Sequence, residues 1–108
     1  MKIENRSYSS FGEHIRRLRA ETSLSLREVA FHLDIDPSFL AKIERNERQP
    51  TTQLIEQISN YYKVHKKELI NELLSDQIAN KIYHEDAVAE ILKVAEKKVL
   101  YLKTKNNG

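Results

Sequence analysis

Apolar residues recur every three or four positions in the first third of the chain, which is the spacing of one helix face. Each of two such stripes follows a serine that has a glutamate three residues later, the signature of a helix-capping box. The apolar positions are Phe11, Ile15 and Leu18 in the first stripe and Leu26, Val29, Ala30 and Leu33 in the second. The pattern predicts helices over residues 11–22 and 26–33.

A third helix is expected to begin within three residues of the end of the second. Asp36 is a favourable N-cap residue, and Pro37 is a favourable first residue of a helix. Leu40 and Ile43 point inward along this segment, and Asn46 is able to adopt the left-handed conformation that ends a helix. The sequence therefore predicts a helix from Pro37 to Asn46, joined to the preceding helix by a tight turn.

Further apolar stripes predict more helices downstream. A fourth helix begins at Pro50 and Thr51, and a fifth over residues 66–74 closes a five-helix core. A short helix over residues 77–83 and a longer one over residues 86–103 follow. The inward positions of the fourth and fifth helices are Leu54, Ile55, Ile58, Tyr61, Leu69, Ile70, Leu73 and Leu74.

Glycine and proline each occur only twice among the 108 residues, so few residues break helices. We therefore expect an all-α protein: an N-terminal arm (residues 1–10), a five-helix domain (residues 11–74) and a helical extension (residues 75–108) that ends in a frayed tail over residues 104–108. The absence of cysteine excludes disulfides and thiolate sites. No apolar run is long enough for a signal peptide or a membrane span, so we expect a cytoplasmic protein without membrane contact.

The basic residues are unevenly distributed, although the net charge is only +2. All seven arginines precede Pro50, and every later basic residue is a lysine. Arginine makes bidentate contacts with guanine and phosphate, so this asymmetry favours a nucleic-acid-binding face in the first half.

The sequence contains no candidate catalytic or metal site. The four histidines never fall at the spacing of a two-histidine metal site, and neither a glycine-rich phosphate loop nor a Gly-x-Ser-x-Gly motif is present. We therefore expect neither an enzyme nor a bound metal or cofactor.

Residues 25–46, SLREVAFHLDIDPSFLAKIERN, resemble the helix-turn-helix of the lambda-repressor-like, or XRE, family of bacterial and phage regulators. The resemblance extends over about residues 11–74. Its markers are Ile15, Leu18, Arg19, Leu24, Ser25, Ala30, Ile35, Leu40, Ile43, Glu44, Arg45 and Pro50. It implies a five-helix lambda-repressor-like domain whose third helix enters the major groove of double-stranded DNA.

The resemblance also assigns roles to single residues. Arg19 and Glu44 match an arginine and a glutamate that pair inside the domain in relatives, which implies a structural ion pair here. Leu26 stands where relatives often have a glutamine that reaches a backbone phosphate. No phosphate contact is therefore predicted for Leu26. Asp34 and Asn46 stand where glycine is common, and both residue types tolerate positive φ.

The outward face of the third helix is the predicted DNA-reading surface. If Leu40 and Ile43 point inward, a rotation of 100° per residue turns the opposite face toward the base edges. The predicted base-reading residues are Pro37, Ser38, Ala41, Lys42 and Arg45. Arg45 lies near the far end of the helix, where a phosphate is an alternative partner. Phe39 lies at the flank, where it either packs in the core or touches a base or sugar.

Phosphate contacts are expected near helix N-termini, because free backbone N–H groups there attract anions. The predicted phosphate-contacting residues are Arg27, Arg48, Gln49 and Thr52. An ordinary solvent-exposed role is an equally good interpretation of each. Glu47, beside Arg48, weakens the local positive field.

The last predicted helix has apolar residues at alternating spacings of four and three, which is typical of a coiled-coil or bundle seam. These residues are Val88, Leu92, Ala95, Val99 and Leu102, supported by Ile78 and Ile82. Because one helix-turn-helix module contacts few base pairs, such proteins usually bind paired half-sites as dimers. We therefore predict a homodimer through this seam; the alternative is that the helix packs on its own domain.

The sequence thus predicts a DNA-binding transcriptional regulator, a repressor that occupies a pseudo-palindromic operator as a dimer. The competing class is a protein-interaction module, such as an antitoxin or adaptor, with a secondary DNA face. Leu26, Glu47 and the small net charge support that alternative. An operator, an effector and a pathway are not specified by these residues.

Overall fold

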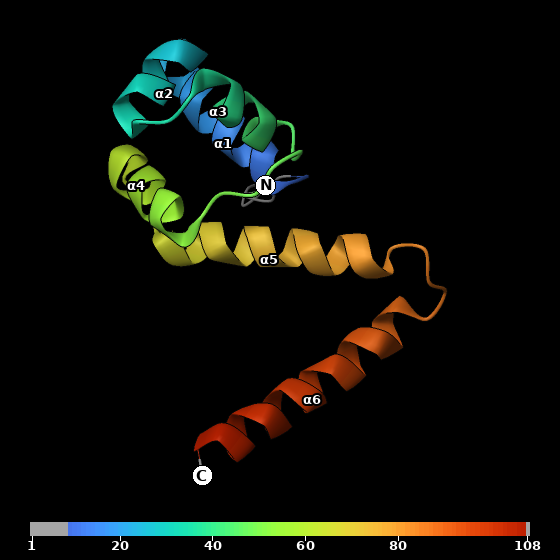
Figure 1. The fold of residues 1–108 in the computed structure, drawn as a ribbon. Helices are drawn as coiled ribbons and strands as arrows, with labels where there is room; N and C mark the ends of the chain where they lie inside the picture. Colours follow the sequence, from blue (N-terminus) through green and yellow to red (C-terminus); the bar gives the residue numbers. More distant parts are fainter. Residues whose placement is uncertain (1–8, 108) are drawn as a thin grey trace, which may run out of the picture. The chain divides into compact units, whose positions relative to one another are not determined.

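The computed structural model describes residues 9–107, which form six α-helices and no strand (Figure 1). The helices are α1 Phe11–Thr22, α2 Leu26–Leu33, α3 Pro37–Glu44, α4 Thr52–Tyr62, α5 Lys66–Ile82 and α6 Val88–Asn107. The all-α class is confirmed. Most of the predicted N-terminal arm, residues 1–8, lies outside the described residues. The chain divides after Asp76 into two compact units, which are described separately.

The two Ser-x-x-Glu motifs begin α1 and α2 in different ways. Ser25 and Glu28 form a complete capping box, because each side chain accepts a hydrogen bond from the other residue's backbone N–H. Ser10 caps α1 by accepting from the N–H of Glu13 at 3.1 Å. The Glu13 carboxylate, however, accepts from the backbone N–H and hydroxyl of Ser9, so the first box is only half formed.

Four non-glycine residues adopt positive φ at the ends of helices among the residues described. Asp34 (φ 58°) and Asn46 (φ 64°) are two of them. Both residues therefore adopt the positive φ that their residue types were expected to tolerate. The other two, Ser23 (φ 62°) and Lys63 (φ 58°), end α1 and α4 and were not signalled by the sequence pattern.

The predicted break between helices over residues 66–74 and 77–83 is wrong, because α5 runs without interruption from Lys66 to Ile82. The intervening Ser75 and Asp76 are compatible with a helix here. The Ser75 hydroxyl donates to the carbonyl of Glu72, and the Asp76 carboxylate accepts from the N–H of Phe11 at 2.7 Å. Serine and aspartate often end helices, but here both side chains form hydrogen bonds that leave the backbone of α5 helical.

The C-terminal ends of two further helices differ from the prediction, by two residues in α3 and by four in α6. α3 ends at Glu44, with Arg45 as its C-cap and Asn46 beyond it, whereas the sequence pattern ended the helix at Asn46. α6 continues to Asn107, four residues past the predicted end, because residues 104–107 contain no glycine or proline to stop it. The part of the predicted frayed tail that the structure describes is therefore helical.

Helices α1 to α4 and the first part of α5 surround one apolar core. Its buried members are Phe11, Ile15, Val29, Ala30, Leu33, Leu40, Ile43, Leu54, Ile55, Ile58 and Leu69. Phe39, Tyr61 and Tyr62 are half-buried and pack against this core. The core-packing alternative for Phe39 is therefore the one that the structure supports.

Candidate nucleic-acid interface

The turn between α2 and α3 fixes the direction of α3. Asp34 adopts the left-handed conformation, its N–H donates to the carbonyl of Phe31, and the N–H of Ile35 donates to the carbonyl of Ala30 at 3.0 Å. Ala30 is completely buried at this point, so a larger side chain would separate the two helices. Asp36 then caps α3, with Pro37 as its first residue.

The cap of α3 also involves one predicted base-reading residue. The Asp36 carboxylate accepts hydrogen bonds from the backbone N–H and the hydroxyl of Ser38, both at 2.7 Å. These hydrogen bonds, that of the hydroxyl first, hold the pKa of Asp36 below its ordinary value. The Ser38 hydroxyl keeps its lone pairs for accepting, since its proton is directed to Asp36.

The inward face of α3 anchors the helix, because Leu40 and Ile43 are completely buried. On the other side, Ser38, Lys42 and Arg45 are exposed, and Pro37 and Ala41 are half-buried. The five predicted base-reading residues therefore belong to the surface of one short helix and its C-cap. Contact between these residues and bases stays a prediction.

A bidentate ion pair connects α1 to the end of α3. Arg19 Nε donates to Glu44 Oε2 at 2.8 Å, and Arg19 Nη2 donates to Glu44 Oε1 at 3.0 Å. The Glu44 side chain is only 5% exposed, and that of Arg19 is 22% exposed. The hydrogen bonds to Glu44 raise the pKa of Arg19. The pair holds the end of α3 against α1.

A second junction between α1 and α3 was not found by sequence reasoning. The Asn46 side chain accepts from the N–H of Gly12 at 2.8 Å and donates to the Ser10 hydroxyl at 2.9 Å. A Cβ on Gly12 would lie 2.5 Å from the carbonyl oxygen of Glu44 and 2.7 Å from that of Ile43. A glycine in the first turn of a predicted helix was the available signal for this close approach.

The predicted phosphate-contacting residues Arg27, Arg48, Gln49 and Thr52 are all exposed. The last three lie in or just after the connection between α3 and α4, and Arg27 is the second residue of α2. The guanidinium of Arg48 lies over the ring of Phe39, 5.4 Å from its centroid, which restricts the arginine without occupying its hydrogen-bond donors. Phosphate contact stays a prediction for all four.

Glu47 forms an ion pair with Arg45. From the sequence, its charge was instead expected to act mainly on the neighbouring Arg48. Arg45 Nε donates to Glu47 Oε2 at 2.9 Å, and Arg45 Nη2 donates to Glu47 Oε1 at 3.1 Å. Both side chains are more than half exposed. The hydrogen bonds raise the pKa of Arg45 and lower that of Glu47. Proximity in sequence favoured Arg48, but the turn at Asn46 directs Glu47 back toward the end of α3.

A helix-turn-helix with an exposed polar face on its second helix is therefore present. A family model described as a helix-turn-helix domain matches residues 12–73, more than half of the chain. The chain belongs to the helix-turn-helix domain family. It is an all-α DNA-binding transcription regulator of the XRE type, as the sequence resemblance implied.

Two solved structures are similar to this helix-turn-helix protein. The restriction-modification controller protein C.AhdI from Aeromonas hydrophila is 29% identical, with a TM-score of 0.50, over 55% of this chain and 86% of that chain. The clp gene regulator ClgR from Corynebacterium glutamicum is 22% identical, with a TM-score of 0.53, over 79% of this chain and 88% of that chain, and it shares the fold. No curated protein is similar enough in sequence to count as a relative.

Residues 9–107 contain neither a membrane-spanning helix nor a metal-binding cluster. No helix there is both long and apolar enough to cross a membrane. Within the same residues, no group of three or more histidine, cysteine, aspartate or glutamate side chains is arranged to hold a metal ion.

Proposed function

We propose that this helix-turn-helix protein is a sequence-specific repressor that binds a pseudo-palindromic operator as a homodimer, with α3 in the major groove of each half-site. The main support for the proposal is that α3 has a firmly held inner face and an exposed polar outer face. Its inner face is fixed by two buried residues, Leu40 and Ile43, and by the Arg19–Glu44 pair, while Ser38, Lys42 and Arg45 are exposed. A rigid helix with an exposed polar face is suited to direct readout of base edges.

The reading surface of α3 is small and only partly polar. Lys42 is suited to the acceptor atoms of guanine, and the half-buried Pro37 and Ala41 offer apolar contact to a thymine methyl group. Ser38 contributes a hydroxyl acceptor. Because so few side chains read bases, affinity depends strongly on phosphate contacts by Arg27, Arg48, Gln49 and Thr52, and on a second subunit.

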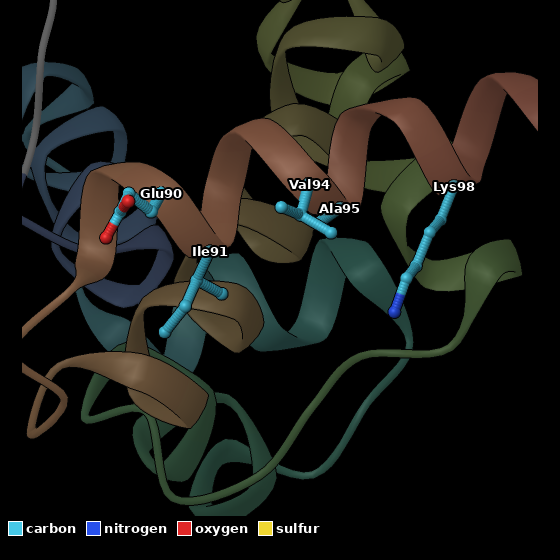
Figure 2. Close-up of a pocket in the computed structure, with 5 residues that line it drawn as sticks. All are labelled: Glu90, Ile91, Val94, Ala95 and Lys98. Atoms are coloured by element: carbon cyan, nitrogen blue, oxygen red, sulfur yellow. The ribbon is translucent and has the colours of Figure 1, made fainter.

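The apolar face of α6 supports dimerisation. Leu92, Val99 and Leu102 of the predicted seam are between 45% and 53% exposed, which is unusual for large apolar side chains that share one face of a helix. Figure 2 shows an adjoining pocket lined by Glu90, Ile91, Val94, Ala95 and Lys98, in which Ile91 and Lys98 extend from the same side of α6. A second copy of α6 would cover such a face with a matching seam.

The similarity to C.AhdI indicates which operators to examine first. That protein is a restriction-modification controller, and it is 29% identical to this chain. We propose control of the promoter of a restriction-modification operon as the first biological role to test.

One feature favours a protein partner as a second function. Phe31, on α2, is 80% exposed, although it lies within the folded domain. Its ring meets that of His32 edge to face, and His32 in turn stacks on Tyr61. An exposed phenylalanine beside other aromatic rings is suited to contact with another protein, as the adaptor alternative requires.

Selection of bound sequences from a random duplex pool tests the proposal directly. We expect two related half-sites in opposite orientation, with centres about one helical turn apart. Binding to random duplex should weaken steeply with salt, because several arginines and lysines displace counterions from phosphates. Weak binding with little salt dependence and no selected sequence would reject the regulator in favour of the protein-interaction module.

A further inference from the structure

The turn after α3 places Glu47 at a defined position beside the reading face, the predicted DNA-reading surface that includes Ser38, Lys42 and Arg45. Asn46 has φ 64°, its N–H donates to the carbonyl of Ile43 at 3.0 Å, and the N–H of Glu47 donates to the carbonyl of Lys42 at 2.8 Å. These two hydrogen bonds are those of a Schellman motif, which fixes the chain that leaves a helix. The backbone of Glu47 is therefore held against the last turn of α3, and its side chain starts from a fixed point.

Asn46 itself is fixed from the other side. Its amide group bonds to the N–H of Gly12 and to the hydroxyl of Ser10, so the turn is attached to the N-terminus of α1. Although Glu47 and Arg45 are exposed, the two backbone positions that carry them are set by the fold. The pair therefore loses less conformational freedom than two long side chains on a mobile loop would.

The geometry of the Arg45–Glu47 pair leaves part of the guanidinium available. Glu47 accepts from Nε and Nη2, which form the side edge of the guanidinium. The end edge, formed by Nη1 and the second hydrogen of Nη2, is not used by this contact. That edge carries two parallel N–H donors, the arrangement that matches guanine O6 and N7 or two oxygens of one phosphate.

We propose that Glu47 is a positioning residue for DNA binding: it holds the side edge of Arg45 and thereby directs the free end edge toward a pair of acceptor atoms on the operator. This inference rests on the proposed function. Glu47 carries a negative charge close to the DNA, and by itself this charge repels phosphates. Glu47 favours binding because it fixes the orientation of Arg45. A guanidinium that is already oriented loses little conformational freedom when it binds DNA.

The surroundings of Glu47 agree with this role. Besides the hydrogen bonds from Arg45, the positive charge of Lys42 also lowers the pKa of Glu47. Glu47 is therefore ionised at neutral pH and lies close to both cations of the reading face. Substitution of Glu47 removes a negative charge from a DNA-binding surface, so electrostatics alone predicts tighter binding. Positioning predicts weaker binding, and the two interpretations differ in sign.

The experiment compares the wild-type protein, Glu47→Ala, Arg45→Ala and the double variant in selection from a random duplex pool and in titrations of the selected operator. Glu21→Gln, an exposed carboxylate of α1, controls for the loss of one negative charge. We expect Glu47→Ala to weaken operator binding by roughly tenfold, within the range for one bidentate contact. In the Arg45→Ala background the same substitution should give no further weakening, because the two residues act as one unit. Melting temperature and helix content should stay unchanged in Glu47→Ala.

The pattern of the loss identifies the acceptor. Lost preference for guanine at one position of each half-site supports positioning toward a base. An equal loss on every sequence, with a shallower salt dependence, supports positioning toward a phosphate. Unchanged or tighter binding by Glu47→Ala overturns the inference, while a wild type that still selects an operator leaves the proposed function intact. A wild type that selects no sequence overturns both.

Discussion

Arg19 and Glu44 join α1 to the last turn of α3 through two parallel hydrogen bonds, of 2.8 and 3.0 Å, to a carboxylate that is nearly inaccessible to solvent. Glu44 lies between Ile43, which is completely buried, and Arg45, which is exposed, so it marks the edge between the core and the reading face. The pair therefore fixes the rotation of α3 about its axis as well as its position.

Glu44→Ala should destabilise the domain, because it leaves the partly buried guanidinium of Arg19 without its partner. The expected loss is about 2 kcal/mol, less than for a fully buried pair because Arg19 is 22% exposed. For a domain of this size this corresponds to roughly 8–16 °C in melting temperature. Thermal unfolding followed by circular dichroism measures it, with the exposed Glu21→Ala as control. An unchanged melting temperature would reject a stabilising role for the pair.

Gly12→Ala should destabilise the protein, although alanine is the better helix former. In an exposed helix the substitution would stabilise by about 0.5–1 kcal/mol. Here the new Cβ meets two backbone carbonyls, at 2.5 and 2.7 Å, that cannot rotate away, and we expect a net loss of about 1–3 kcal/mol. The control is Ala20→Gly at an exposed site of α1, which measures propensity alone. Stabilisation by Gly12→Ala would show that α1 and α3 lie further apart than described.

Local patterns were sufficient to predict α1 and α2 to the residue, because a cap begins each helix and the apolar stripe ends with it. They failed where the deciding interaction comes from another element. Asp76 stays helical because its carboxylate serves Phe11, 65 positions earlier in the chain. Likewise, the partner of Glu47 depends on the left-handed turn at Asn46, and sequence adjacency pointed to the wrong arginine.

Lys42→Ala and Arg48→Ala should weaken DNA binding in different ways. Lys42 lies on the reading face, so its loss should cost about 1–3 kcal/mol on the selected operator and relax preference at one base position. Arg48 lies in the connection to α4, so its loss should weaken all sequences alike and reduce the salt slope by about one. Titrations on operator and random duplex at several salt concentrations separate the two. The assignment of roles would be reversed if base preference changed only in Arg48→Ala.

Leu92→Glu should convert the proposed dimer into a monomer. Leu92 lies within the apolar seam of α6, and a carboxylate there would be buried without a partner in a paired interface. The measurement is the mass in solution by sedimentation or light scattering, over a range of concentrations. Lys97→Glu, which also introduces a carboxylate but lies on the charged side of the same helix, is the control and should keep the wild-type mass. A Leu92→Glu variant with unchanged mass would exclude the seam as the dimer interface.

Tyr62→Phe should change stability mainly at high pH. The Tyr62 hydroxyl is buried and has no hydrogen-bond partner within residues 9–107, and burial raises its pKa to about 12. In the unfolded chain a tyrosine ionises near pH 10, so between about pH 10 and 12 the unfolded state releases a proton that the folded state retains. The folded state is therefore progressively destabilised across this window.

Phenylalanine cannot ionise, so Tyr62→Phe should remove this part of the alkaline loss. At neutral pH the variant should be as stable as the wild type or slightly more stable, because it removes an unsatisfied polar group and keeps the ring. Denaturant unfolding at pH 7, 10 and 11 measures both effects, with Tyr101→Phe, exposed on α6, as the control. If Tyr62→Phe lost stability at neutral pH, the hydroxyl would have a partner in solution, and the cause assigned to the raised pKa would be wrong.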